Sequence, residues 1–136
     1  MPTSPFAELR QRSFRFSLDI IQYCRTLPGT WEARRIGEQL FRAGTSVGAN
    51  YFAATQRRSD ADFIAKIALV VEEVDECRYW LALLKYSGIN DSIIRFKLAQ
   101  ESRELLLIFG ASLATARANA KARKAVKADR HRARRN

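Results

Sequence analysis

The side chains best suited to binding chemistry lie in the last twenty residues, 117–136. Nine of these residues are basic and one is acidic, whereas residues 1–116 carry fifteen basic and thirteen acidic side chains. The basic residues are Arg117, Lys121, Arg123, Lys124, Lys127, Arg130, Arg132, Arg134 and Arg135. Arginine can contact a phosphate through two hydrogen bonds and stack on unpaired bases. We therefore predict that this stretch binds nucleic acid electrostatically, with RNA favoured over DNA.

Five further arginines could enlarge this basic surface. Arg57 and Arg58 are adjacent between two expected helices, and Arg34, Arg35 and Arg42 lie on the polar side of a helix that begins near residue 30. We include all five as candidate nucleic-acid contacts. Runs of charge are often only solvated, so a tail that serves solubility alone is the alternative interpretation.

The acidic residues lack the partners that a catalytic or metal site needs. They are densest at Glu72, Glu73, Asp75 and Glu76. A di-metal site in a helical bundle uses Glu-x-x-His pairs, and the one histidine, His131, lies in the basic tail. We expect Glu72 and Glu76 to pair instead with arginines such as Arg42 or Arg78. With no activated serine and no glycine-rich phosphate loop, we predict no enzyme, no metal and no cofactor.

Composition and chain breaks predict how these residues are positioned. Apolar residues make up 47% of the 136, and Gly and Pro only nine, which is typical of a single helical domain. Pro28-Gly29, Gln56–Ser59 and Ser87-Gly88 divide the chain into four helices. Short connections make successive helices antiparallel. We predict an all-α, up-down-up-down four-helix bundle over 1–116, with a basic C-terminal extension, frayed helix or disordered, over 117–136.

The third expected helix has the clearest apolar pattern. Its apolar residues alternate in steps of four and three, which predicts burial along one seam. They are Phe63, Ile67, Val70, Val74, Cys77, Leu81 and Leu84. We expect Ser59 to cap this helix and Asn90 to cap the fourth. The expected core face of the fourth helix is Ile94, Leu98, Leu105, Phe109 and Ser112.

Small residues interrupt the second helix, where R-A-G-T-S-V-G-A-N-Y occupies 42–51. Each glycine costs about 1 kcal/mol of helix propensity relative to alanine, so we interpret Gly44, Ser46 and Gly48 as a point of close approach between helices or between subunits. Ser46 and Asn50 are expected to form interhelical hydrogen bonds, and Tyr51 shares the apolar face.

Tyr79 and Trp80 form an aromatic pair on the third helix. They could stack on bases, but we favour packing at the edge of an interface, with the indole N–H hydrogen-bonded.

Three segments together resemble a known family. They are G-T-S-V-G-A-N-Y at 44–51, S-D-A-D-F-I-A-K at 59–66 and E-E-V-D-E-C-R-Y-W-L-A-L-L at 72–84. The sequence resembles the four helix bundle proteins encoded within intervening sequences of bacterial 23S ribosomal RNA genes. It is more distantly similar to accessory variability proteins of diversity-generating retroelements. Ala53 departs from the family pattern, which carries glutamate there, so this chain lacks the carboxylate for any network that uses it.

The resemblance implies a homo-oligomer, a pentamer, with nucleic-acid association and no established enzymatic activity. The alternative is an oligomeric protein scaffold or adaptor, for example for a reverse transcriptase. Charged residues near the N-terminus, and an apolar run at 105–111 too short to span a bilayer, predict a cytoplasmic protein without membrane association. Cys24 and Cys77 are expected to be buried thiols.

Overall fold

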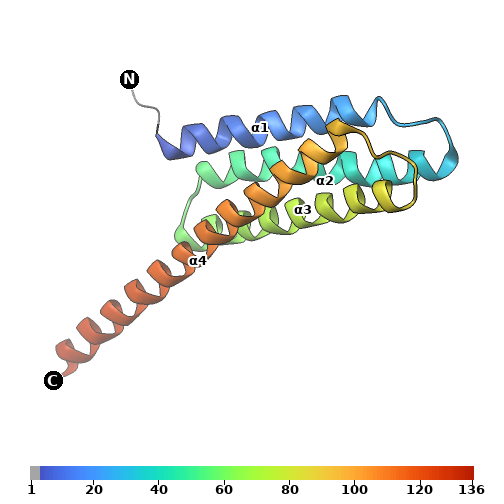
Figure 1. Cartoon of the computed structure of the whole chain (residues 1–136). Coiled ribbons are helices and arrows are strands. Elements are labelled where there is room, and N and C mark those ends of the chain that lie inside the picture. The colour runs from blue at the N-terminus through green and yellow to red at the C-terminus, as the bar shows by residue number, and fades with distance from the viewer. Residues whose placement is uncertain (1–3) are drawn as a thin grey trace.

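The computed structural model describes residues 4–136 as four α-helices with short connections (Figure 1). Helix α1 is Pro5–Cys24, α2 is Trp31–Thr55, α3 is Asp60–Tyr86 and α4 is Ile93–Arg135. Successive helices run antiparallel, and each packs extensively on the next, whereas α1 and α4 meet over a much smaller area. The predicted all-α, up-down-up-down four-helix bundle is confirmed.

Local sequence sets both ends of α3. The Ser59 hydroxyl accepts a hydrogen bond of 3.1 Å from the backbone N–H of Asp62, as expected for its N-cap. At the other end Gly88 has a φ of +79°, a left-handed conformation that favours glycine and ends the helix. The predicted bounds of α3 are therefore close to the observed ones.

The connection before α4 differs from the prediction. Ser92, not Asn90, is the N-cap, and its hydroxyl accepts from the backbone N–H of Arg95 at 3.2 Å. The Asn90 side-chain oxygen instead accepts from the Tyr23 hydroxyl at 2.9 Å and from the Ser92 hydroxyl at 2.8 Å. This amide therefore fixes the loop to α1 and does not cap a helix.

Arg95 takes the inward position that the apolar pattern assigned to Ile94. The Arg95 side chain is buried, and its guanidinium donates to Asp91 Oδ1 at 3.2 Å and to the Leu81 carbonyl at 3.4 Å. Ile94 is half exposed, so its predicted place in the core is wrong. The aliphatic stem of an arginine can fill an apolar site while its polar head finds partners, and a pattern of residue types does not show this.

The core otherwise follows the predicted seam. Ile67, Val70, Val74, Cys77, Leu81 and Leu84 of α3 are all buried, and Phe63 packs against their cluster. On α4 the buried apolar residues are Leu98, Leu105, Phe109 and Leu113. Tyr51 of α2 is buried with its ring centroid 5.1 Å from that of Phe109.

The glycines of α2 lie against α1 of the same chain. A Cβ atom on Gly44 would come within 2.6 Å of the Ile20 side chain, and one on Gly48 within 2.8 Å of the Ser17 hydroxyl. That hydroxyl donates to the Gly44 carbonyl at 2.7 Å and accepts from the Gly48 N–H at 3.1 Å. The closest approach is therefore between α1 and α2, with Ser17 as the bridging residue.

Ser46 and Asn50 bond within their own helix. The Ser46 hydroxyl donates to the Arg42 carbonyl at 2.8 Å, and the Asn50 amide donates to the Ser46 carbonyl at 2.9 Å. The prediction that these two side chains form interhelical hydrogen bonds is therefore wrong within this chain. In a helix, a short polar side chain can reach the carbonyl of the preceding turn without any partner helix.

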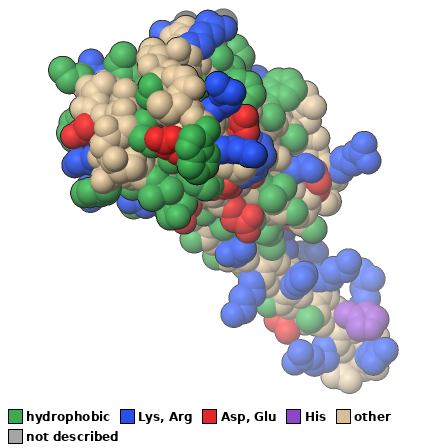
Figure 2. Space-filling view, turned by 90° about the vertical axis from the view of Figure 1, so that its right-hand side faces the viewer, with side chains coloured by type: hydrophobic (Ala, Val, Ile, Leu, Met, Phe, Trp, Pro, Cys, Tyr) green, Lys and Arg blue, Asp and Glu red, His purple; other side chains and the backbone are tan. Residues whose placement is uncertain are grey.

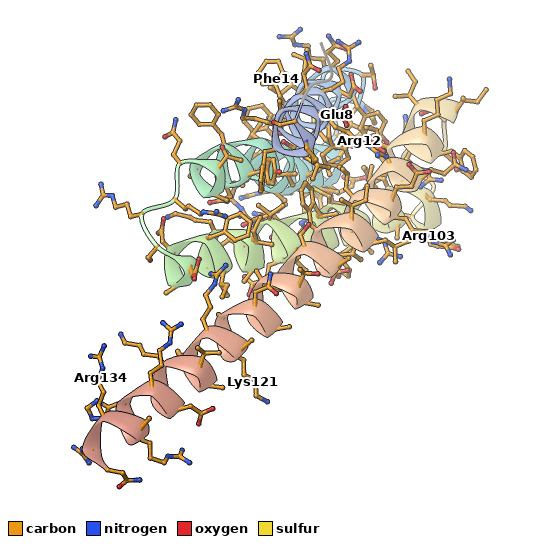
Figure 3. All side chains as sticks on the ribbon, turned by 90° about the vertical axis from the view of Figure 1, so that its left-hand side faces the viewer. Glu8, Arg12, Phe14, Arg103, Lys121 and Arg134 are labelled. Carbon is orange, nitrogen blue, oxygen red and sulfur yellow. The ribbon has the colours of Figure 1, made fainter. Side chains whose placement is uncertain are left out.

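Ion pairs join helix α1 to α4. Arg12 Nη2 lies 2.6 Å from Glu101 Oε1 and 2.6 Å from Glu104 Oε2, and Figure 3 shows Arg12 pointing from α1 toward α4. Beyond these contacts α4 crosses the bundle and projects past the other three helices (Figure 1). No helix in residues 4–136 combines the length and apolar character needed to cross a bilayer.

Replacing Gly44 with alanine should destabilise the protein. Overpacking against Ile20 costs about 1–3 kcal/mol, more than the gain of about 1 kcal/mol in helix propensity. We expect a lower midpoint of urea unfolding, followed by circular dichroism. The matched control is Gly110→Ala in α4, where a Cβ meets nothing within 4 Å; it should be neutral or stabilising. Equal stability of the two variants would contradict the packing assigned to Gly44.

Candidate nucleic-acid interface

The basic tail forms the free part of α4, residues 117–135, called the extension here. Helix α4 is continuous across residue 116, and every residue from 121 onward is exposed. Figure 2 shows the extension projecting from the bundle with Lys and Arg side chains crowding its visible surface. The two parts of the chain therefore differ in burial and charge rather than in backbone conformation.

Four basic residues form one stripe along the extension. Arg123, Lys127, Arg130 and Arg134 recur in steps of four, three and four, which places them on one helix face. At a rise of 1.5 Å per residue the stripe is about 17 Å long. We call these four residues the basic stripe.

The basic stripe continues the face of α4 that is buried inside the bundle. The buried members of that face are Leu98, Ser102, Leu105, Phe109 and Leu113. Steps of three and four lead on through Ala116 and Ala120 to Arg123. The face that packs on α3 therefore turns from apolar to cationic as α4 passes the first turn of α3.

Few acidic groups neutralise the extension. Within the described chain, Arg123 pairs with Asp60 of α3, and Arg132 lies 3.9 Å from Asp129. The other basic residues have no ion pair with any described residue; they are Arg117, Lys121, Lys124, Lys127, Arg130, Arg134 and Arg135. Figure 3 shows Lys121 and Arg134 pointing away from the helix into open space.

The structure brings one of the five other candidate arginines to the extension. Arg57 and Arg123 line the same pocket, and the Arg57 guanidinium lies 5.0 Å from the centroid of the Phe63 ring. Arg58 is adjacent and exposed. Arg34 and Arg35 lie near the opposite end of α2, about 30 Å along the helix from its last turn, and Arg34 donates to the Gly29 carbonyl at 3.3 Å.

Arg42 is engaged by acidic residues of α3. It forms a hydrogen-bonded ion pair with Glu76, and its Nη1 lies 3.6 Å from Glu73 Oε2. The hydrogen bond from Arg42 lowers the pKa of Glu76, whereas burial raises the pKa of Glu73. The Arg42 guanidinium is already paired with both carboxylates, so it is poorly placed to bind phosphate. Glu72 has no ion pair in the described residues, and Arg78 pairs with Asp75 at 3.5 Å.

Tyr79 and Trp80 pack on each other at the surface of α3. Their ring centroids lie 4.9 Å apart in an edge-to-face arrangement, and Tyr79 is largely exposed. The Trp80 indole N–H donates to Glu76 Oε1 at 3.2 Å. Trp80 therefore has the hydrogen bond that we expect of a packed tryptophan.

Sequence reasoning missed Ser17, which joins α1 to α2. The available signal was a pair of small residues, Ser13 and Ser17, spaced like Gly44 and Gly48. On two helices, matching small residues four apart allow the backbones to approach closely, and the Ser13 carbonyl would lie 3.3 Å from a Cβ on Gly48.

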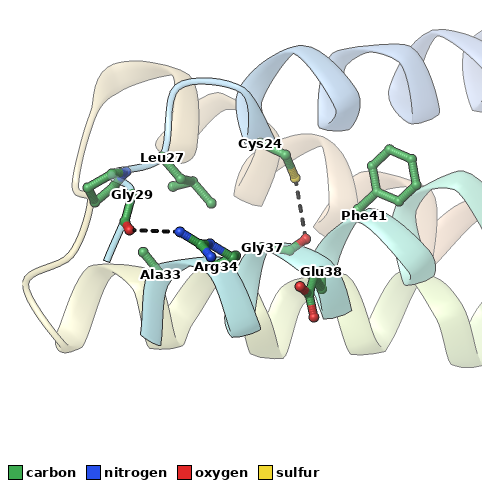
Figure 4. A pocket seen from close by; sticks show the side chains of 9 residues that line it. Cys24, Leu27, Gly29, Ala33, Arg34, Gly37, Glu38 and Phe41 are labelled. Atoms are coloured by element: carbon green, nitrogen blue, oxygen red, sulfur yellow. Dashed lines mark hydrogen bonds between the residues drawn. The ribbon is translucent and has the colours of Figure 1, made fainter. Parts of the chain in front are cut away.

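A separate hollow of about 490 Å³ lies beside the connection between α1 and α2 (Figure 4). Its titratable groups include Cys24 and Glu38. The Cys24 thiol donates weakly to the Gly37 carbonyl at 3.6 Å, and burial raises its pKa to about 11. At neutral pH this side chain is a neutral thiol rather than a nucleophilic thiolate. Across residues 4–136 no group of three or more His, Cys, Asp or Glu side chains is arranged to hold a metal ion.

The geometry defines a class of protein: a small four-helix bundle whose last helix continues into a cationic extension. A comparison with protein families matches residues 7–109 to the family described as 23S rRNA-intervening sequence protein. The chain therefore belongs to this family, as its sequence motifs suggested. The extension lies outside the matched range.

A solved structure supports the same assignment. The chain is similar to a protein of unknown function from the S23 ribosomal protein family of Bacteroides thetaiotaomicron, at 27% identity and a TM-score of 0.74. The match covers 80% of this chain and 97% of that one. A comparison with curated proteins finds no match.

Alkylation of Cys24 should be slow at neutral pH. A pKa of about 11 in place of 9.0 lowers the thiolate fraction about a hundredfold. We expect the rate with iodoacetamide, measured by peptide mass spectrometry, to rise with pH until about 11, whereas the urea-unfolded chain should level off near its ordinary pKa. Cys77 is an internal control, since deeper burial should leave it unreacted. A midpoint near the ordinary thiol pKa in the folded protein would contradict the burial of Cys24.

Proposed function

We propose that the protein is a non-enzymatic, homo-oligomeric helical bundle that binds nucleic acid, RNA in preference to DNA, through the extension. The observation that carries this proposal is the basic stripe, a row of exposed cations on a helix that projects from the bundle. Arg57 and Arg58 enlarge the interface where the extension leaves the bundle. Binding is mainly electrostatic and has little sequence specificity.

The choice of RNA rests on side-chain type and exposure. Six of the nine basic residues in 117–136 are arginines, which stack on unpaired bases as well as contacting phosphate. A projecting helix of this kind can lie along a groove or a single strand. We place the protein in the cytoplasm, where reducing conditions suit its two free cysteines.

The homo-oligomer part of the proposal is supported by an exposed apolar groove between α1 and α2. The groove has a volume of about 770 Å³, and its lining includes Phe14, Leu18, Ile21 and Phe52. Phe14 is 66% exposed, so its ring is available to a second copy. Large contiguous apolar surfaces on small proteins commonly mark interfaces. We propose five copies, as the family resemblance implies.

The same groove supports a second candidate function. A protein scaffold, for example an adaptor for a reverse transcriptase, would use apolar surface for its partner, and the extension would serve charge matching. Nuclease treatment before a pull-down separates the two functions, because a protein partner survives removal of nucleic acid whereas RNA-bridged partners are lost.

Neutralising the basic stripe should weaken RNA binding. For a variant combining Lys127→Gln, Arg130→Gln and Arg134→Gln, the salt dependence of log Kd should become shallower by about 2, because each phosphate contact to a single strand contributes about 0.7. Fluorescence anisotropy with a labelled RNA across a salt series measures both the Kd and its salt dependence. The matched control combines Arg25→Gln, Arg34→Gln and Arg35→Gln, which removes the same charge at the other end of the bundle. Equal loss in both variants would show that net charge, not the stripe, drives binding.

Light scattering should show an assembly held together by the α1–α2 groove. The groove leaves apolar side chains exposed in a single copy, which favours self-association. We expect a mass of five times the 15.5 kDa of the chain, the copy number that the family resemblance implies. Phe14→Glu should reduce this mass by placing a charge in the groove, whereas Val126→Glu on the extension should not. A monomeric unmodified protein would refute the proposed assembly.

A further inference from the structure

A second pocket lies where the extension leaves the bundle. It has a volume of about 450 Å³, and the first turn of α1, the start of α3 and the middle of α4 all contribute to it. This is within the range of about 300–1,000 Å³ that is typical of small-ligand sites. Arg123, the first residue of the basic stripe, lines this pocket.

One wall of the pocket is aromatic. The rings of Phe6 and Phe63 meet edge to face, with centroids 6.4 Å apart and planes at 84°. The Arg57 guanidinium lies 5.0 Å from the Phe63 centroid, which adds a planar cation to the same wall. Phe6 is 48% exposed, so part of its ring is open to a ligand. Aromatic rings and arginine planes are the groups on which proteins stack unpaired bases.

The α4 side of the pocket carries polar side chains with unused hydrogen-bonding capacity. Ser112, Thr115 and Asn119 line the pocket, and their spacing of three and four places them on one face of α4. None of the three side chains has a hydrogen-bond partner among residues 4–136. By contrast, the Ser102 hydroxyl of the same helix donates to the Ala99 carbonyl at 2.8 Å. The amide of Asn119 can both donate and accept, as the edge of a nucleobase requires.

The charge around the pocket suits a nucleic-acid strand. Arg57 and Arg123 contribute two positive charges. Asp60 contributes one negative charge, which forms an ion pair with Arg123. Beyond Arg123 the basic stripe leads away from the pocket along the extension. If the phosphates of an RNA strand contact the basic stripe, the nucleotide that follows them along the strand lies beside the pocket.

We infer that this pocket holds an unpaired nucleobase of the bound RNA, between the aromatic wall of Phe6 and Phe63 and the polar side chains of α4. The inference rests on the proposed function, because binding of RNA to the basic stripe is what places the strand beside the pocket. Stacking tolerates any base, whereas a base inside a duplex cannot enter the pocket. The protein therefore distinguishes single-stranded from paired RNA more strongly than it distinguishes sequences.

The test compares two phenylalanine substitutions that remove similar exposed rings. Phe6→Ala opens the pocket, and Phe96→Ala is the matched control, since Phe96 is 52% exposed and Phe6 48%. We expect Phe6→Ala to weaken binding to a single-stranded RNA about tenfold, as for loss of one stacked base. Its affinity for a duplex of the same length should not change, and Phe96→Ala should match the unmodified protein with both RNAs.

A second variant removes hydrogen bonding without opening the pocket. Asn119 is exposed on α4, so Asn119→Leu should keep the fold, which circular dichroism would verify. This variant should also weaken single-strand binding selectively. If Phe6→Ala, Asn119→Leu and Phe96→Ala all bind both RNAs like the unmodified protein, the pocket is not a base site, although the extension can still be the RNA interface. That result would also follow if the pocket served a protein side chain. Failure of the unmodified protein to bind either RNA would reject the proposed function itself.

Discussion

The change from apolar to cationic residues along one face of α4 is the constraint that shapes the molecule. Up to Leu113 this face is buried in the bundle, and beyond Arg123 the same face is too highly charged to be buried without partners. The helix itself continues, because alanine and basic residues favour helix. The contact between Arg123 and Asp60 marks the place where packing gives way to solvent. The projecting helix and the pocket at its base both follow from this change.

The helices of the bundle that supports the extension do not all pack on one another equally. Backbone approach at Gly44 and Gly48 joins α1 closely to α2, and the seam of α3 packs against both α2 and α4. Between α1 and α4 the small contact is reinforced by the ion pairs of Arg12. The contact between α3 and α4 is much larger than the contact between α1 and α4, so α4 is positioned mainly by α3. The direction of the extension is thus set by how α4 crosses α3.

Most of the fold was predictable, because hydrophobic periodicity reports which face of a helix is buried. The residues predicted to form the seam of α3, from Ile67 through Val70, Val74, Cys77 and Leu81 to Leu84, are all buried. Ser59 caps α3 as expected. The errors occur where a polar residue acts against its usual tendency. Arg95 is buried in place of Ile94, and Ser46 and Asn50 bond to their own helix. In each case the choice of partner depends on local geometry, which residue type does not specify.

Residue types and their spacing along the chain are enough to predict the four helices, their order, the core face of α3 and the concentration of positive charge at the C-terminus. By contrast, the tertiary structure sets which cations are free and which are paired. It engaged Arg42 with Glu73 and Glu76, placed Arg57 beside the extension and left Arg34 at the far end of α2. It also brought Phe6, Phe63 and Asn119 around one pocket. Such groupings join residues that lie far apart in the chain, so they follow from how the helices pack and not from any local pattern.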